Sequence, residues 1–454
     1  MEYRIEQDTM GRISVPAHRL WGAQTQRSLE NFPIGEERMP PPLIHAFALL
    51  KRACALSNHS LGRLDAPRRD LILQTCDEIL AGGLSEEFPL SLWQTGSGTQ
   101  SNMNLNEVIA GRGNQLAGEA LLHPNDQVNL SQSSNDTFPT AMHIAAVTEI
   151  HRRLLPALEE MEAVLSRLEE ENKDVLKIGR THLQDAVPMT FAQEISGWLS
   201  MITSARKMIL QSLEGLYQLA LGGTAVGTGL NSPPGFAEAA TGEIAAFTGL
   251  PFTSAPNKFH ALSSKDAMVF SHGALKALAA NLMKIANDVR WLSSGPRCGL
   301  GEIFIPENEP GSSIMPGKVN PTQSEALTMV AVQVMANDTA ISLSASQGNF
   351  QLNVFMPVCA YNYLQSVRLL ADAVSSFTAR CLAGIRPNRE KMRENVDRSL
   401  MTVTALTPHV GYENGAKIAK LAYRENISLR EAALTLGLMT PEEFDSAFRP
   451  EDMV

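Results

Sequence analysis

Two long stretches of the chain carry apolar residues at alternating intervals of four and three positions. The first runs from Ala141 to about Lys173 and the second from Asp266 to Leu292. Their apolar seams are Leu154, Leu158, Met161, Leu165 and Leu168, and then Leu275, Leu278, Leu282, Ile285, Val289 and Leu292. This spacing keeps apolar side chains on one face of a helix. Both stretches are therefore predicted to be long helices, and Pro156 should kink the first or mark its first turn.

Helical patterns dominate the rest of the chain as well. They cover residues 43–59, 68–81, 191–221, 322–346 and about 357–384. Hydrophobic residues make up 44% of the chain and aromatic residues only 6%, so an aliphatic core between helices is expected. The predicted fold class is mainly α-helical, with a long central bundle.

The long seams also bear on assembly. They exceed what one four-helix bundle must hide, which favours a core shared by several chains. A monomeric bundle of stacked helical hairpins is the alternative. The predicted helices become shorter after about Arg386. At the other end of the chain, residues 1–40 are predicted to form an irregular arm with one hairpin. We expect three domains, at 1–138 (mixed, mainly helical), 139–388 (central bundle) and 389–454 (small and helical).

Composition excludes several classes of function. A formal net charge of -10 argues against nucleic acid or an anionic membrane as the main partner. The five cysteines are scattered without a C-x-x-C pair, which fits a reducing cytoplasm. We find no signal-peptide core and no uninterrupted apolar run of membrane-span length.

Two polar loops interrupt the helices and contain neither Lys nor Arg. One lies within Trp93–Asn106 and includes Ser97, Gly98 and Thr99; the other, Ser131–Thr137, includes Ser133, Ser134 and Asn135. Neutral donors beside a helix start can bind a carboxylate, which suits a small dicarboxylate. Ordinary helix capping is the alternative for each loop.

A third polar loop, Gly179–Asp185, contains Thr181 and His182. Histidine can exchange a proton or hold a water molecule near neutral pH, although a lone histidine is more often structural.

The fourth loop, Gly311–Glu325, is here called the signature loop, and it reads GSSIMPGKVNPTQSE. Its glycines and prolines alternate free and stiff backbone, so N–H groups and side chains can surround one small anion. Asn320, Pro321 and Gln323 suit the N-cap, first and third positions of the following helix. A mobile surface turn is the alternative reading.

The sequence gives no sign of a cofactor. The ten histidines form no H-E-x-x-H motif, and no Cys/His cluster has the spacing of metal ligands. The glycine-rich run at 222–229 follows a helix and lacks the G-x-G-x-x-G order. We therefore predict neither a metal nor an organic cofactor, and a tight backbone turn between helices at 222–229, beside the pocket.

Several motifs together resemble the fumarase/aspartase superfamily, and the form MPGKVNPTQ resembles class II fumarases in particular. In chain order they are TGSGTQSNMNLNEV, HPNDQVN, SQSSNDTFPTAMH, GRTHLQDA, GGTAVGTGLN, MKIANDVRWLSSGPRCG and GSSIMPGKVNPTQ. The resemblance covers essentially the whole chain. It implies a homotetramer whose active sites use loops of three subunits, and reversible hydration of fumarate to (S)-malate.

The resemblance also implies residue roles. Ser312 is similar to the base that removes the C3 proton of malate, and Lys318 to the cation that stabilises the resulting carboxylate charge. His182 resembles the residue that handles water, with Glu325 its charge partner from another subunit. The remaining similar positions are substrate ligands: Ser97, Gly98, Thr99, Ser133, Ser134, Asn135, Thr181, Ser313, Val319 and Asn320.

Two positions separate the chain from other superfamily members. Aspartase-like proteins have glutamine in place of His182 and alanine in place of Gly317, so fumarate chemistry is favoured. An ammonia-lyase acting on aspartate and a helical scaffold without turnover are the alternatives.

A second anion site of the family resembles His123, Pro124, Asn125 and Asp126. Here Gln127 replaces the usual aspartate, and Ala120-Leu121-Leu122 stands in a shortened segment. Simple capping of the next turn by His123 and Asp126 is the alternative.

Overall fold

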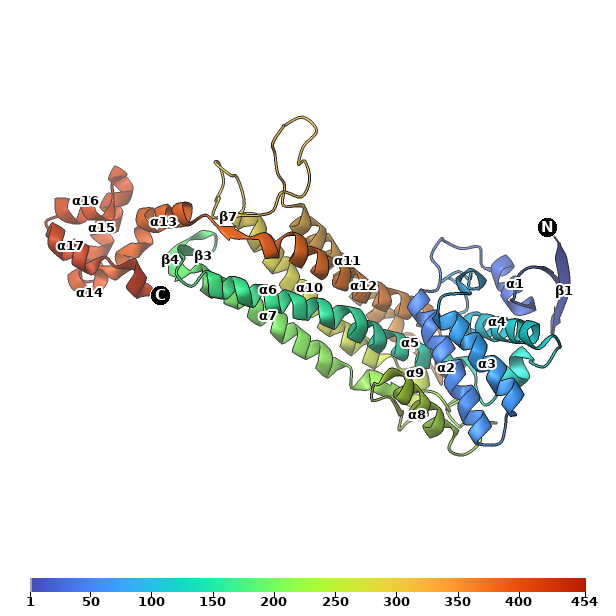
Figure 1. The fold of residues 1–454 in the computed structure, drawn as a ribbon. Coiled ribbons are helices and arrows are strands. Elements are labelled where there is room, and N and C mark those ends of the chain that lie inside the picture. The colour runs from blue at the N-terminus through green and yellow to red at the C-terminus, as the bar shows by residue number, and fades with distance from the viewer. Residues whose placement is uncertain (1) are drawn as a thin grey trace. The chain divides into compact units, whose positions relative to one another are not determined.

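The computed structural model describes residues 2–454, and helices dominate it (Figure 1). The chain divides into two compact units. The first comprises Met1–Pro156, Ala205–Ala279 and Ala331–Ala371, and the second Ala157–Ser204, Ala280–Val330 and Asp372–Val454. The predicted mainly α-helical fold is confirmed. The division into three domains stays a prediction.

The first unit opens with the expected hairpin, β1 (Tyr3–Asp8) paired antiparallel with β2 (Gly11–Pro16). The helices that follow within this unit are α1 (Ala23–Asn31), α2 (Pro41–Ser60), α3 (Ala66–Leu80), α4 (Thr99–Ala117), α5 (Ser134–Glu149), α8 (Phe236–Thr248) and α9 (Lys258–Ser263). Helix α2 packs against α3, α5 and α8. Its Phe47 ring meets Phe138 of α5 edge to face at 5.6 Å. Helix α2 is thus the centre of this unit.

Short strands join the segments between these helices. Strand β5 (Gln218–Leu219) pairs parallel with β6 (Thr253–Ser254), and β8 (Gly348–Asn349) pairs antiparallel with β9 (Leu352–Asn353).

A wide turn joins α5 to α6 (Leu155–Glu171) without ending the helical path. Residues Ile150–Leu154 form a π-helical turn, and Pro156 follows in the first turn of α6. Proline has no N–H to donate to the preceding turn, so the wider turn falls where that hydrogen bond is missing. The predicted long helix over 141–173 and the place of Pro156 are confirmed.

Four long helices contribute residues to both units: α7 (Phe191–Ser212), α10 (Asp266–Leu292), α11 (Thr322–Ala345) and α12 (Met356–Arg380). Helix α10 has the bounds predicted for it. Helix α7 ends at Ser212, so the predicted end at Leu221 is wrong. The leucines beyond Ser212 are buried, but they do not lie in a helix. Leu216 is in a 3₁₀ turn, Leu219 in a short strand and Leu221 in a loop, so apolar residues there do not indicate a continuing helix.

The second unit contains a long hairpin, β3 (Leu176–Thr181) with β4 (Gln184–Thr190), and a short pair, β7 (Ile303–Phe304) with β10 (Arg386–Pro387). Its last helices are α13 (Arg389–Arg398), α14 (Thr407–Val410), α15 (Tyr412–Glu425), α16 (Leu429–Thr435) and α17 (Pro441–Ala447). Helices α14 to α17 enclose a small apolar core around Leu406, Ile418 and Phe444. Capping boxes begin α16 and α17, since Ser428 pairs with Glu431 and Thr440 with Glu443.

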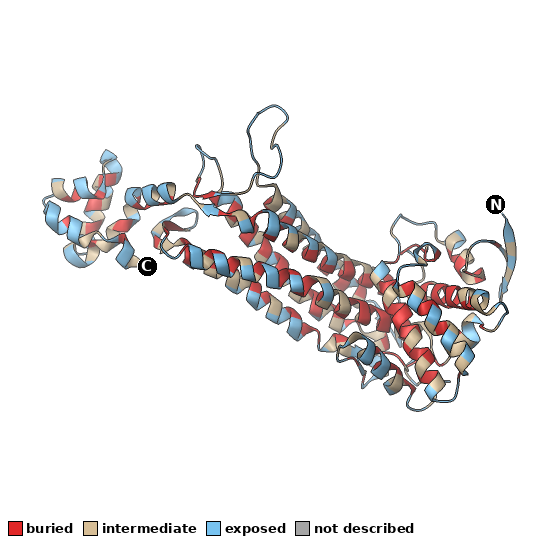
Figure 2. Ribbon diagram, in the orientation of Figure 1, coloured by how far each residue is buried: buried red, intermediate tan, exposed pale blue. Residues whose placement is uncertain are grey.

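The predicted seams are buried within a single chain, with no seam residue above 4% exposure (Figure 2). They therefore need no second chain to cover them. The prediction that seams of this length exceed what one chain can bury is wrong. The large apolar side chains left exposed on the long helices are different ones, including Phe270, Trp291, Met329, Val332 and Leu343.

One described helix, α11, is long and apolar enough by composition to cross a membrane, a test that core helices of globular proteins also pass. No membrane-spanning run was predicted from the sequence, because Glu325 and Asp338 interrupt the apolar residues of this helix.

Candidate active site

Three hydroxyl side chains in the first unit form a hydrogen-bonded row, here called the hydroxyl cluster. Ser97 Oγ lies 2.9 Å from Thr99 Oγ1, which lies 2.8 Å from Ser134 Oγ. Thr99 is the first residue of α4 and Ser134 the first of α5. Two helix N-termini therefore converge on these hydroxyls, and the two helix dipoles create positive potential there. Such a site can accept a carboxylate.

The predicted loop over Trp93–Asn106 is too long, because α4 begins at Thr99. Asn102, Asn104 and Asn106 are buried in this helix, and their side-chain amides donate hydrogen bonds to other parts of the unit. Tertiary hydrogen bonds thus override the low helix propensity of asparagine.

Gly98 sets the path of the chain into α4. Its φ of +71° is left-handed, and a Cβ there would lie 1.9 Å from the Phe138 ring. Gly98 is therefore required by both backbone and packing.

The second predicted binding loop begins α5 with a capping box. Ser133 Oγ accepts from the backbone of the first turn, and Asp136 Oδ1 accepts from Ser133 N at 2.9 Å. Asp136 Oδ2 also accepts from Gly222 N and Thr224 N, at 3.0 and 2.8 Å. Burial raises the pKa of Asp136 to about 6 although these donors oppose the shift.

The glycine-rich run lies against this loop, because Asn135 Nδ2 donates to Ala225 O at 2.8 Å. The predicted tight turn at 222–229 is confirmed, and it lies beside this loop.

In the second unit, His182 lies at the tip of the β3–β4 hairpin. His182 and Leu183 both have left-handed backbone, with φ of +57° and +60°. The predicted loop over 179–185 is wrong in its ends, since strand pairing continues to Thr181 and Gln184. A two-residue turn of this kind suits the twist of a hairpin, yet neither residue is glycine, so the turn is strained. The imidazole at this tip is exposed to solvent.

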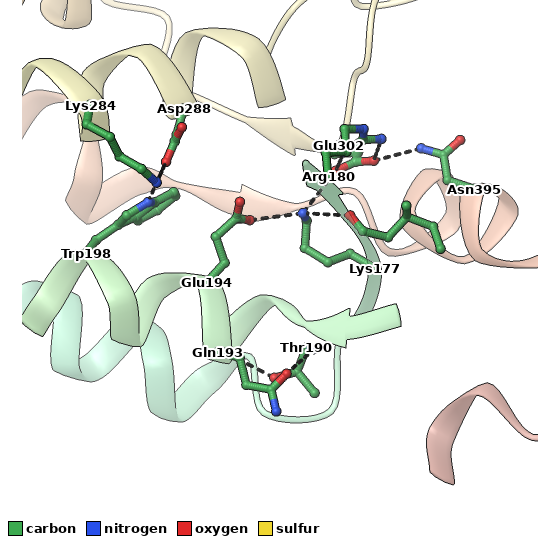
Figure 3. Close-up of polar contacts among 11 residues, drawn as sticks. Lys177, Arg180, Thr190, Gln193, Glu194, Trp198, Lys284, Asp288, Glu302 and Asn395 are labelled. Carbon is green, nitrogen blue, oxygen red and sulfur yellow. Dashed lines mark hydrogen bonds and ion pairs between the residues drawn. The ribbon is translucent and has the colours of Figure 1, made fainter. Parts of the chain in front are cut away.

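Buried charges hold the base of this hairpin (Figure 3). These charges are called the ion cluster, and they belong to Lys177, Arg180, Glu194 and Glu302. Lys177 Nζ lies 3.1 Å from the carboxylate of Glu194 and 3.7 Å from that of Glu302. Arg180 bonds both oxygens of Glu302, at 3.1 and 2.5 Å. Burial alone would raise the pKa of Glu302, but the bonds from Arg180 and the charge of Lys177 hold it below its ordinary value. The cluster fixes β3 two residues before His182.

The signature loop closes on itself at its base. Gly311 N donates to Lys318 O at 2.8 Å, and Asn320 Nδ2 donates to Gly311 O at 2.6 Å. A Cβ on Gly311 would lie 2.5 Å from Lys318 O, and Gly317 has a left-handed φ of +81°. Both glycines are therefore needed for this closure.

Within the loop, backbone N–H groups point at one side-chain oxygen. Ser312 Oγ accepts from Ile314 N at 3.2 Å and from Met315 N at 3.0 Å. Donors aimed at an oxygen favour its ionised form. Ser312 is thus the hydroxyl in this loop whose oxygen accepts two backbone hydrogen bonds.

The start of α11 differs from prediction. The helix begins at Thr322, and Pro321 O accepts its first hydrogen bond, from Glu325 N at 3.1 Å. Asn320 therefore lies one position too early to cap the helix, and its side chain closes the loop instead. Lys318, Val319, Asn320 and Glu325 line one cavity of about 980 Å³.

The segment of the possible second anion site forms a capped turn. His123 Nδ1 accepts from Asn125 N at 3.3 Å and lies 3.4 Å from Asp126, while Gln127 Oε1 accepts from His123 N at 2.7 Å. His123, Pro124 and Asn125 also line a polar cavity of about 1010 Å³ with Arg4 and Arg19.

The structure thus brings the candidate residues together in separate groups. Ser97, Thr99 and Ser134 are bonded to one another, with Gly98, Ser133 and Asn135 beside them in sequence. Lys318, Val319, Asn320 and Glu325 share a cavity, with Ser312 and Ser313 in the same loop, while Thr181 and His182 occupy the hairpin. Over residues 2–454, no hydrogen bond links the hairpin tip to the signature loop, and no group of His, Cys, Asp and Glu side chains could hold a metal ion.

Known proteins resemble the chain over its full length. Residues 11–336 match the Lyase family and residues 403–454 the Fumarase C C-terminus family. Proteins named fumarate hydratase class II from Bacillus subtilis and Helicobacter pylori are 60% and 61% identical, over 100% of this chain and 99% of theirs. The chain belongs to the class II fumarate hydratase family.

Solved structures agree with this membership. The crystal structure of class II fumarase from Schistosoma mansoni aligns with a TM-score of 0.97 at 44% identity, covering 100% of this chain and 99% of that one. A fumarate lyase:delta crystallin from Brucella melitensis aligns with a TM-score of 0.95 at 39% identity, with the same coverage. The predicted family is confirmed.

Sequence reasoning missed one residue of this class II fold, Lys51 of α2. Its ammonium lies buried beneath the two binding segments of the first unit. No motif marks it, because it stands within an apolar helical pattern. Only its burial among amides distinguishes it from a surface lysine.

Proposed function

We propose that this chain catalyses the reversible hydration of fumarate to (S)-malate. The observation that carries the proposal is an identity of about 60% over the whole chain with proteins named fumarate hydratase class II. The hydroxyl cluster and the signature loop supply the groups that a small dicarboxylate requires.

Ser312 is the proposed base, which removes a proton from C3 of malate. Because a serine hydroxyl is weakly acidic, it needs donors that stabilise its alkoxide. The N–H groups of Ile314 and Met315 are such donors. The electron pair from the C–H bond moves onto the adjacent carboxylate, and Lys318 stabilises the added negative charge.

His182 is proposed to handle water at C2, where the hydroxyl leaves with a proton in the malate-to-fumarate direction. Glu325 of a neighbouring subunit would orient its imidazole. The proposed substrate ligands are Ser97, Gly98, Thr99, Ser133, Ser134, Asn135, Thr181, Ser313, Val319 and Asn320. His123, Pro124, Asn125 and Asp126 are kept as a possible second anion site, with no role in the chemical step.

The finer proposal on assembly is a homotetramer in which loops of three subunits form each site. Exposed apolar side chains on α10 and α11, such as Phe270, Met329 and Val332, support it because water-exposed apolar surface favours association. We also propose a cytoplasmic location, which accords with five free cysteine thiols.

Ultraviolet absorbance separates this proposal from its alternatives, since fumarate absorbs strongly and malate and aspartate hardly do. The purified protein would be incubated with malate and, separately, with aspartate. Fumarate from malate alone supports the hydratase. Fumarate from aspartate alone would make the chain an ammonia-lyase, and fumarate from neither would leave a scaffold without turnover.

A further inference from the structure

Lys51 is a fully buried cation whose hydrogen-bond acceptors are all neutral. It is 1% exposed, and Nζ donates to Asn102 Oδ1 at 2.7 Å, Gln132 Oε1 at 2.8 Å and Asn129 Oδ1 at 3.1 Å. Three acceptors satisfy the three protons of an ammonium group. The positive charge itself has no hydrogen-bonded carboxylate.

The acceptors belong to the segments that carry the hydroxyl cluster. Asn102 lies one helical turn after Thr99 in α4, and Gln132 immediately precedes Ser133. Thr137 of α5 also donates to Asn102 Oδ1, at 3.0 Å. Lys51 therefore ties α2 to the starts of both helices whose N-termini converge on Ser97, Thr99 and Ser134.

The two thiols near Lys51 do not neutralise it at pH 7. Burial raises the pKa of Cys54 on α2 and of Cys76 on α3, so both thiols stay uncharged. Asp136 of α5 is the opposing charge, and its carboxylate is engaged by the N–H groups of Ser133, Gly222 and Thr224. Burial of an ammonium is unfavourable, which makes a use for its charge the simplest reason for its position.

We propose that Lys51 is a positioning residue that aligns the two substrate-binding segments and supplies the buried positive charge that favours a dianionic C4 substrate. The inference rests on the proposed function. Lys51 would add a cation beneath the two predicted binding loops, whose side chains at the hydroxyl cluster are neutral.

The test compares wild-type protein with Lys51→Met, which keeps an unbranched side chain one atom shorter and removes the charge. Calorimetry would measure the dissociation constant of succinate, an unreactive C4 dianion, from pH 7 to pH 10. At pH 7 the variant should bind about tenfold more weakly. Because burial lowers the pKa of Lys51 to about 8, the wild-type protein loses this charge at alkaline pH, and the ratio of the two constants should fall toward one.

A merely structural lysine would give a ratio that does not change with pH, or no weakening at all, and either result overturns the proposal. Lys265→Met is the matched control, because Lys265 is also buried and also donates to three oxygens, those of Ala261, Leu262 and Ser264. It should leave succinate binding unchanged. Lys51→Gln serves as a second neutral variant if Lys51→Met does not fold.

Succinate binding is independent of turnover, so the test also separates the two proposals. A wild-type protein that forms no fumarate from malate contradicts the hydratase assignment. A wild-type protein that turns over normally, but whose succinate affinity is unaffected by Lys51→Met, contradicts only the role of Lys51. In kinetics, the loss should appear mainly in KM for fumarate, with kcat changed less than threefold at roughly pH 7.

Discussion

Arg180 binds Glu302 through two parallel contacts, Nη1 to Oε2 at 3.1 Å and Nη2 to Oε1 at 2.5 Å. The Glu302 side chain is fully buried and also accepts from Asn395 Nδ2 of α13 at 2.8 Å. One carboxylate therefore joins the hairpin of His182, the segment that leads into the signature loop, and the first helix of the C-terminal tail.

Replacing this carboxylate should disturb all three. Glu302→Gln keeps the size of the side chain but leaves Arg180 and Lys177 with one fewer negative partner. Loss of one member of a buried ion pair costs about 3 kcal/mol or more, so the free energy of unfolding in urea should fall by that order. Turnover should fall with it, because β3 positions His182.

Glu394→Gln is the control, since Glu394 pairs with Lys391 and Arg398 on the exposed surface of α13. Exposed pairs contribute little, and its unfolding midpoint should match wild type. An unchanged midpoint for Glu302→Gln as well would show that the ion cluster does not stabilise the fold.

Ser312→Ala removes the oxygen at which two backbone N–H groups point. We predict that kcat falls by about 100-fold or more, because the proposed base is lost, while the oligomer stays intact. Initial rates of fumarate formation from malate, followed by ultraviolet absorbance, and size-exclusion chromatography would check both. Ser346→Ala, which removes an exposed hydroxyl bonded to Leu343 O and Gln347 Nε2, should keep full activity. Near-normal turnover of Ser312→Ala would remove this serine from the chemical step.

His182→Asn tests the imidazole separately from the turn. Asparagine tolerates left-handed backbone well, so the hairpin tip should keep its shape. We predict a decrease in kcat of about 10-fold to 100-fold and a flattened pH profile, with no change in melting temperature. His409→Asn in the C-terminal tail should behave as wild type. If His182→Asn retains the wild-type pH profile, another group handles water.

Gly98→Ala tests the approach of the backbone to Phe138. The substitution meets both a left-handed φ and a Cβ position 1.9 Å from the ring, whereas Gly118→Ala at the other end of α4 meets only φ of +73° with open space around it. We expect Gly98→Ala to destabilise the protein by about 2 kcal/mol more than Gly118→Ala. Equal melting temperatures of the two variants would contradict this packing argument.

The sequence predicted those parts of the fold that depend on local periodicity. The bounds of α10 and the path from Ala141 through Pro156 follow from side-chain spacing alone. Predictions failed where distant residues decide the outcome. Asn102, Asn104 and Asn106 read as loop residues, yet hydrogen bonds from other segments hold them in α4.

The site was predictable as a set of motifs but not as an arrangement. Ser312 and His182 lie within sequence motifs of the family, whereas no motif identifies Lys51 or Glu302. Their roles depend on burial among groups that lie far away in the chain, at Gln132 for Lys51 and at Arg180 for Glu302. Such long-range electrostatic partners become visible only once the helices are packed.

A crystal structure of the assembled protein with succinate bound tests the proposed active site most directly. The account predicts that one chamber contains Ser312, Lys318 and Asn320 of one subunit, the hydroxyl cluster of a second, and His182 of a third, with both succinate carboxylates bound to these groups. Succinate bound elsewhere, or Ser312 and His182 on separate surfaces of the assembly, would contradict it.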